Sequence, residues 1–187
     1  MPISPPRSAF IVCLPLVLFL HAGVSPSCAE PHAGDKPPHA GRDTTTGRAF
    51  ELRVKEALES GGYTTRFQVE VGRRPNGGKH FADVVASKNG RTILVSLKWQ
   101  QVGGTAEQKI PYELICLAEI LAAGKNGDTE AVGSPAFDAA CLVMGGDGWT
   151  LRDWYLSDAL EKHLPAARNI PRHTLESFLV AARAGKI

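Results

Sequence analysis

The chain has 187 residues and a formal net charge of +2, with 43% hydrophobic and 21% charged residues. This length suits one domain of ordinary size, and the balance of apolar and charged residues excludes a wholly disordered or fibrous protein. The small net charge excludes a polybasic protein that binds nucleic acid through bulk charge alone. Four cysteines are too few for a disulfide-dense scaffold.

The first 29 residues have the pattern of an export signal. Arg7 is the one charged side chain before Glu30, and an apolar run of 11 residues follows it at 10–20. This run is too short to cross a hydrocarbon core of about 30 Å as a helix, so no stable membrane span is expected. Small residues up to Ala29 favour cleavage there. We therefore expect 1–29 to be a signal peptide and the mature protein to be periplasmic or secreted. If the segment is not a signal, the protein is cytoplasmic.

The next segment, 30–46, is rich in Pro, Gly, His and Thr and has no apolar periodicity. This composition predicts a disordered linker. We therefore expect the folded domain to cover 47–187.

The folded domain is expected to begin with a helix and a strand. Apolar residues at helical spacing predict a helix over 47–60. Phe67, Val69 and Val71 then alternate with polar residues, which predicts a strand over 64–71 with these three side chains on one side.

Two further strands are expected to form a hairpin. The apolar segments 81–87 and 91–100 predict the strands, and a loop rich in Arg, Pro, Asn and Gly precedes the first of them. Asn89 and Gly90 favour a tight turn of the primed type between the two strands.

Helices and strands alternate in the second half of the chain. We expect a helix over 111–123, a buried central strand over 137–144, and a short strand or turn followed by a helix within 149–163. A short strand near 169–170 precedes a final helix over 174–183. This order predicts an α/β fold, with a mixed β-sheet flanked by helices, in a single domain.

Cleavage of the signal peptide would leave two cysteines, Cys116 and Cys141. In an oxidising compartment they could pair. Both fall in apolar segments, which favours two buried thiols instead. Without a CxxC motif or an adjacent histidine they do not form a zinc signature.

Two charged residues, Asp83 and Lys98, stand inside otherwise apolar strands. If the Asn-Gly pair forms a two-residue hairpin loop, Asp83 faces Ser96 across the strands. Strand alternation then puts Ser96, Lys98 and Gln100 on the same face as Asp83. These four side chains are therefore expected to gather near one end of the hairpin.

Charges inside apolar strands are costly unless they are paired or bound to an ion. Asp83 and Lys98 therefore form either a structural ion pair or part of a site where oxygen ligands hold a hard cation such as Mg²⁺. Glu51, one residue from the apolar stripe of the first helix, is a candidate to join that site, although alone it is equally a solvated glutamate. His80 is not counted, because strand alternation sends it away from this face.

The sequence resembles the PD-(D/E)xK nuclease superfamily over about 46–145. Glu51 ends the helix segment RAFE, Asp83 lies in the strand segment ADVV, and Lys98 ends SLK on the next strand. The arrangement is similar to that of small restriction enzymes and archaeal-type Holliday-junction resolvases. The resemblance implies a restriction-endonuclease-like fold and a Mg²⁺- or Mn²⁺-dependent endonuclease that hydrolyses DNA, with a homodimer as the common assembly.

The resemblance also implies a role for each matching residue. Asp83 would hold the metal, and Glu51 would bind it directly or through water. Lys98 would orient the attacking water or stabilise charge on the phosphate. The family usually has Glu or Asp at the position of Ser96, which is a poor Mg²⁺ ligand, and Gln100 is expected to help through its amide oxygen. The alternative is a catalytically weak nuclease-fold module that binds DNA without cutting it.

Charge is distributed unevenly along the chain. Segment 66–109 has eight Lys or Arg and three acidic residues, whereas 126–161 has one arginine and seven acidic residues. A basic half that contains the candidate site suits a nucleic-acid backbone; the alternative is an ordinary dipolar surface. The expected DNA contacts are Arg73, Arg74 and Lys79 before the second strand, and Gln108 and Lys109 after the third.

Overall fold

The computed structural model describes residues 45–126 and 136–187, which all belong to one unit, Gly41–Ile187. The expected signal peptide and nearly all of the expected linker therefore lie outside the described residues. Within the described ranges, no helix is both long and apolar enough to cross a membrane.

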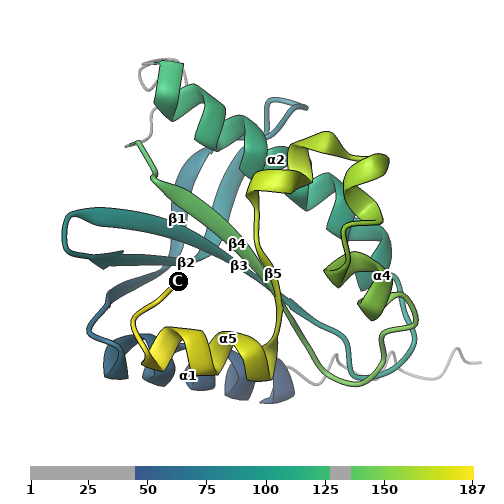
Figure 1. Cartoon of the computed structure of the whole chain (residues 1–187), viewed down its shortest axis with the longest axis horizontal. Helices are drawn as coiled ribbons and strands as arrows, with labels where there is room; N and C mark the ends of the chain where they lie inside the picture. Colours follow the sequence, from purple (N-terminus) through teal and green to yellow (C-terminus); the bar gives the residue numbers. More distant parts are fainter. Residues whose placement is uncertain (1–44, 127–135) are drawn as a thin grey trace, which may run out of the picture. The chain divides into compact units, whose positions relative to one another are not determined.

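The described chain forms one mixed sheet between two layers of helices (Figure 1). Strands β1, β2 and β3 are antiparallel neighbours, and β4 and β5 continue the sheet in parallel with β3. This arrangement confirms the expected mixed α/β fold. The elements are α1 (Thr45–Ser60), β1 (Thr64–Arg73), β2 (Lys79–Lys88), β3 (Arg91–Trp99), α2 (Ala106–Asn126), β4 (Ala139–Gly145), α4 (Arg152–Leu156), the 3-10 turns η1 (Leu160–Lys162) and η2 (Pro165–Asn169), β5 (Arg172–Thr174) and α5 (Leu175–Arg183).

Two separate cores cover the two faces of the sheet. Helices α1 and α5 lie side by side against one face, and α2 covers the other (Figure 1). The first face buries Val54, Leu58, Val84, Val95, Val143 and Phe178. The face under α2 buries Val85, Leu94, Leu114, Leu117, Leu142 and Met144.

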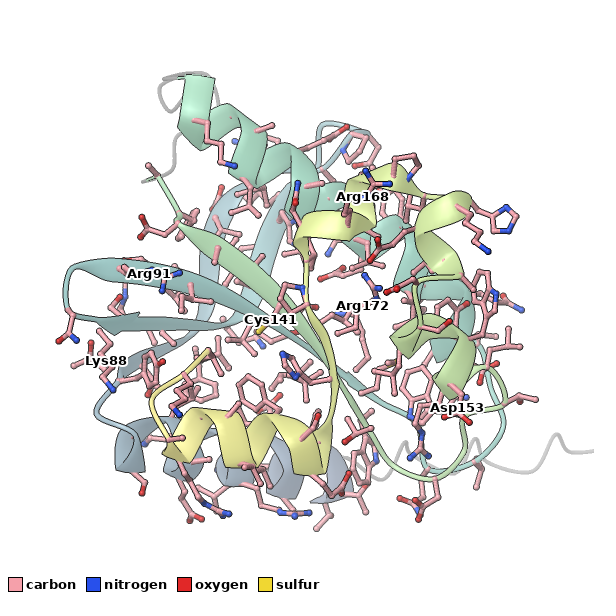
Figure 2. The ribbon with its side chains drawn as sticks, viewed as in Figure 1. Lys88, Arg91, Cys141, Asp153, Arg168 and Arg172 are labelled. Atoms are coloured by element: carbon pink, nitrogen blue, oxygen red, sulfur yellow. The ribbon has the colours of Figure 1, made fainter. Side chains whose placement is uncertain are left out.

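Both described cysteines are free and buried, as the apolar segments around them predicted. Cys141 lies in the interior on β4 (Figure 2) and packs in the core under α1 and α5. Burial raises the pKa of the Cys141 thiol to about 12. Cys116 lies on α2, which covers the opposite face.

Helix α2 begins five residues before the expected start, and Pro111 lies inside it. Proline has no N–H, so it cannot bond the carbonyl four residues earlier, which belongs to Glu107. The Tyr155 hydroxyl donates a 2.8 Å hydrogen bond to that carbonyl instead. A tertiary contact thus satisfies the group that Pro111 leaves free, which allows the helix to extend past the proline.

The helix expected within 149–163 is present as the short helix α4, and the 3-10 turn η1 follows it. Arg172 at the start of β5 holds the region together (Figure 2). Its guanidinium donates to the Tyr155 carbonyl at 2.7 Å and to the Ala167 carbonyl at 2.8 Å, and it pairs with Glu161 at 3.0 Å. Thr174 caps the last helix, α5, because its side chain accepts from Ser177 N–H.

The β2–β3 hairpin has the expected register. Lys88 pairs with Arg91, and the pairing continues to Val84 and Val95. The two loop residues both have positive φ, 52° at Asn89 and 78° at Gly90, as a primed turn requires.

Strand β1 does not alternate as expected. Phe67 packs under α1 and α5, whereas Val69 packs under α2. Gln68 between them has φ of +51°, an uncommon conformation for a residue other than glycine. The neighbouring strand changes faces as well, because Val84 belongs to the first core and Ala82 to the second. Strand parity counted from the hairpin turn therefore fails beyond this point.

Candidate functional site

Asp83 lies where the β2–β3 ladder ends. Backbone pairing stops at Val84 and Val95. Beyond it, Leu97 N–H donates a 2.7 Å hydrogen bond to Asp83 Oδ2 rather than to a backbone carbonyl. The carboxylate is therefore held by the strand that carries the other expected site residues.

Lys98 and Ser96 meet Asp83 on the face of the sheet that α2 covers. Lys98 Nζ donates to Ser96 Oγ at 2.7 Å and lies 3.6 Å from Asp83 Oδ2. Ser96 Oγ lies 3.5 Å from the same carboxylate oxygen. The structure thus brings together three of the side chains that the hairpin register grouped.

Glu113 of α2 joins this cluster, and sequence reasoning missed it. The Ser96 hydroxyl donates to Glu113 Oε1 at 2.6 Å, and Lys98 Nζ lies 3.2 Å from the same oxygen. A signal was present, because Glu113 falls on the helical stripe of Ile110, Leu114 and Leu117, which are all fully buried. A carboxylate on the apolar face of a helix calls for a partner inside the protein.

The environment of Glu113 keeps its carboxylate ionised. Burial raises the pKa of Glu113, but the contact with His80, the positive charge of Lys98 and the hydrogen bond from Ser96 outweigh burial and lower the pKa to about 2. Two carboxylates, Asp83 and Glu113, therefore face one ammonium group.

His80 also reaches Glu113, contrary to the expectation from strand alternation. Its side chain is fully buried, and its Nε2 lies 3.6 Å from Glu113 Oε1. The change of face near Gln68 explains the error, because His80 follows Ala82 toward α2.

The structure does not bring Gln100 or Glu51 into the cluster. The Gln100 amide nitrogen donates to Gly148 O at 2.7 Å, and its amide oxygen accepts from Ala106 N at 3.0 Å. Gln100 therefore joins two loops and caps α2. Glu51 lies on α1, which packs on the other face of the sheet, and lines a surface recess with Phe67.

The cluster offers two carboxylates as candidate ligands for the expected divalent cation. Within 45–126 and 136–187, no group of three or more His, Cys, Asp or Glu side chains is placed to hold a metal ion. Magnesium is usually held by one or two carboxylates, with water and phosphate oxygens completing its shell. Asp83 and Glu113 already converge on one positive charge, that of Lys98. No described residue donates a hydrogen bond to Asp83 Oδ1 or Glu113 Oε2, so each carboxylate keeps a free oxygen.

The three basic residues expected to contact DNA before β2 differ in whether they form an ion pair. Lys79 pairs with Glu70 at 2.6 Å, whereas Arg73 and Arg74 form no ion pair with any described residue. Burial raises the pKa of Cys116, and the positive charge of Arg74 opposes that rise. The positive charge of Arg74 therefore acts on the first half of α2, where Tyr112 and Cys116 lie.

Gln108 and Lys109 are exposed in the first turn of α2. Glu107 beside them turns toward the following loop, where its Oε1 accepts from the backbone N–H groups of Thr150 and Leu151. Neither Gln108 nor Lys109 forms a side-chain ion pair with a residue that the structure describes.

A family model described as a PD-(D/E)XK nuclease superfamily domain matches residues 42–185, which is more than half of the chain and includes the whole cluster. A comparison with curated proteins found no match.

Solved structures with a related shape include a restriction endonuclease and a restriction-enzyme subunit. A protein of unknown function, AF1548, matches with 16% identity and a TM-score of 0.36 over 67% of this chain and 57% of its own. The restriction endonuclease FokI bound to DNA matches with 12% identity and a TM-score of 0.40 over 78% of this chain and 26% of its own. The small subunit of the heterodimeric restriction endonuclease R.BspD6I matches with 13% identity and a TM-score of 0.36 over 73% of this chain and 67% of its own. This chain thus spans little more than half of the first structure and about a quarter of FokI.

Proposed function

The chain belongs to the PD-(D/E)XK nuclease superfamily, and we propose that it is a metal-dependent endonuclease that hydrolyses the phosphodiester bonds of DNA. The observation that carries this proposal is the connected cluster of Asp83, Ser96, Lys98 and Glu113. In it, the Lys98 ammonium lies 3.6 Å from the Asp83 carboxylate and 3.2 Å from the Glu113 carboxylate.

Asp83 and Glu113 are the residues proposed to hold Mg²⁺ or Mn²⁺. When bound, such an ion stabilises negative charge on a phosphate and makes water a better nucleophile. Lys98 pairs with both carboxylates, and its ammonium is placed to donate to a phosphate oxygen or to orient water. The side chains of Asp83 and Lys98 are 26% and 17% exposed. Both side chains are therefore partly open to solvent, which a purely structural buried ion pair does not need.

Glu113 favours cleavage over the alternative of a binding module without activity. That alternative rests on Ser96, which occupies the position where the superfamily usually has an acid. In this chain the Ser96 hydroxyl donates to the Glu113 carboxylate at 2.6 Å. A second carboxylate is thus available beside Asp83, although it comes from α2 rather than from β3.

DNA is the proposed substrate, with Arg73, Arg74, Gln108 and Lys109 as the proposed backbone contacts. Arg73 ends β1 and Arg74 begins the turn that leads to β2 and Asp83. Gln108 and Lys109 lie in the first turn of α2, between Lys98 and Glu113 in the chain. Phosphate groups attract unpaired basic side chains such as Arg73, Arg74 and Lys109, and the amide of Gln108 can donate a hydrogen bond to them. We also propose a homodimer, which sedimentation equilibrium of the free protein would test.

The test is cleavage of supercoiled plasmid by the full chain in Mg²⁺, Mn²⁺ or EDTA. Lys98→Ala and Asp83→Ala run beside the wild type, with Lys55→Ala of the exposed face of α1 as a control. We expect nicking that requires metal, persists in the control and disappears in the two cluster variants. A wild-type protein that binds DNA but cuts no plasmid, branched or single-stranded DNA in either metal would overturn the proposal and favour the binding module.

A further inference from the structure

His80 is a buried polar residue for which packing alone gives no reason. Its side chain is fully buried in β2, beneath α2. Neither ring nitrogen has a hydrogen-bond partner among the described residues. An unpaired buried polar group costs stability, and an apolar side chain of similar volume would avoid that cost.

The nearest acceptor to His80 is the carboxylate of Glu113. His80 Nε2 lies 3.6 Å from Glu113 Oε1, a few tenths of an ångström beyond a hydrogen bond. The same oxygen also accepts from Ser96 at 2.6 Å and faces Lys98 at 3.2 Å. Three donors therefore surround Oε1, while no described residue donates to Oε2.

The backbone departs from regular strand geometry on the path to this contact. With regular alternation, His80 would point away from the cluster. The positive φ of Gln68 and the register shift between Glu70 and Gly72 accompany its turn toward α2. A positive φ at a residue other than glycine costs free energy. The backbone therefore adopts an unfavourable conformation at Gln68 next to the segment that turns His80 toward α2.

We propose that His80 is a positioning residue that donates its Nε2–H to Glu113 Oε1. It thereby fixes the carboxylate so that Oε2 stays free of protein donors and available to the catalytic cation. The inference rests on the proposed function, because it assigns Glu113 to the cation. Residues that orient a metal ligand from behind typically change metal affinity 10- to 100-fold when replaced.

Binding of Mn²⁺ to the DNA-free full chain, followed by electron paramagnetic resonance, tests this role without requiring activity. His80→Met has a similar volume and no donor, whereas His80→Gln keeps an N–H near the place of Nε2. We expect the methionine variant to bind Mn²⁺ about tenfold more weakly and the glutamine variant to stay within about threefold of wild type. The melting temperature of the methionine variant, measured beside its Mn²⁺ affinity, shows how far the imidazole also contributes to packing.

Glu113→Gln separates failure of this inference from failure of the proposed function. If Glu113→Gln binds Mn²⁺ like wild type, the cation site itself is wrong. If Glu113→Gln weakens Mn²⁺ binding but His80→Met does not, the cation site stands and the role of His80 is overturned. A lower melting temperature with unchanged Mn²⁺ affinity would show a structural histidine. If His80→Met does not fold, His80→Asn replaces it, because its shorter amide cannot reach Glu113.

Discussion

Ser96 and Glu113 are joined by a 2.6 Å hydrogen bond in which the serine hydroxyl donates to the carboxylate. Ser96 also accepts from the ammonium of Lys98 at 2.7 Å. The small side chain leaves room for the helix carboxylate at the place where a strand carboxylate would otherwise lie. Ser96 thus links Lys98 of β3 to Glu113 of α2.

Replacing Glu113 should abolish cleavage if it serves as the second carboxylate. We expect Glu113→Gln to reduce the rate of plasmid nicking about 100-fold or more, since losing a ligand costs at least as much as losing the residues that orient it. Glu51→Gln is the matched control, because α1 packs on the other face of the sheet. Its rate should stay within about threefold of wild type. A large loss in Glu51→Gln with a small one in Glu113→Gln would restore the ligand set that the resemblance implied.

Moving the carboxylate back to β3 should be tolerated only when Glu113 is removed. Ser96→Glu places a second buried carboxylate against Glu113, and an uncompensated buried charge costs about 3 kcal/mol or more. We expect urea unfolding to show that this variant is less stable than wild type, and plasmid nicking to show that it is inactive. The double variant Ser96→Glu/Glu113→Ser should recover stability and part of the activity. If the single and double variants lose equal stability and activity, a carboxylate at position 96 cannot replace that of Glu113.

Local sequence predicted the hairpin and its register. Asn89 and Gly90 adopt positive φ readily, so they fix the pairing of Lys88 with Arg91. The register then brings Asp83 and Ser96 together. These features depend on residues close in the chain, which is why they were predictable.

The rest of the cluster depends on contacts that local patterns do not specify. Glu113 reaches the site through the packing of α2 on the sheet, and Pro111 obscured where that helix begins. His80 reaches it because Gln68 adopts a positive φ, which glutamine does not favour. Gln100 shares strand parity with Lys98, but the end of β3 leads it to Gly148 instead.

Processing of the chain after Ala29 is expected if residues 1–29 are a signal peptide. The chain should then be recovered from the periplasm or medium of an expressing bacterium with Glu30 as its first residue, as intact-mass spectrometry would show. Ala29→Arg should block cleavage there, because the peptidase requires a small residue at this place. Recovery of the uncleaved chain from the cytoplasm alone would contradict export.

Acid should remove the stability that the ionised Glu113 provides. The pKa of Glu113 is lowered to about 2 in the folded protein, from 4.5 as the ordinary value. The contribution is therefore complete above about pH 5 and is lost as the pH falls toward 2. In EDTA, the difference in free energy of unfolding between wild type and Glu113→Gln should shrink by about 3 kcal/mol over this range.

A second acid-sensitive group is common to both proteins in that comparison. Burial lowers the pKa of His173, so its protonation below about pH 6.5 destabilises the fold in each. The difference between the two proteins removes this effect and isolates Glu113. A difference that does not change between pH 5 and pH 2 would show that the carboxylate gains nothing from its neighbours.

Two arginines without an ion pair to any described residue, Arg73 at the end of β1 and Arg74 after it, should contribute to DNA affinity more than the paired Lys79. Each phosphate contact that is lost reduces the slope of log affinity against log salt by about 0.9 for duplex DNA. We expect Arg73→Ala/Arg74→Ala to reduce this slope by nearly 2 in fluorescence anisotropy titrations with metal omitted. Lys79→Ala should change it less, because Lys79 is held by Glu70 at 2.6 Å. If the lysine variant has the larger effect, DNA approaches from the side of Lys79 and the proposed contacts of Arg73 and Arg74 are wrong.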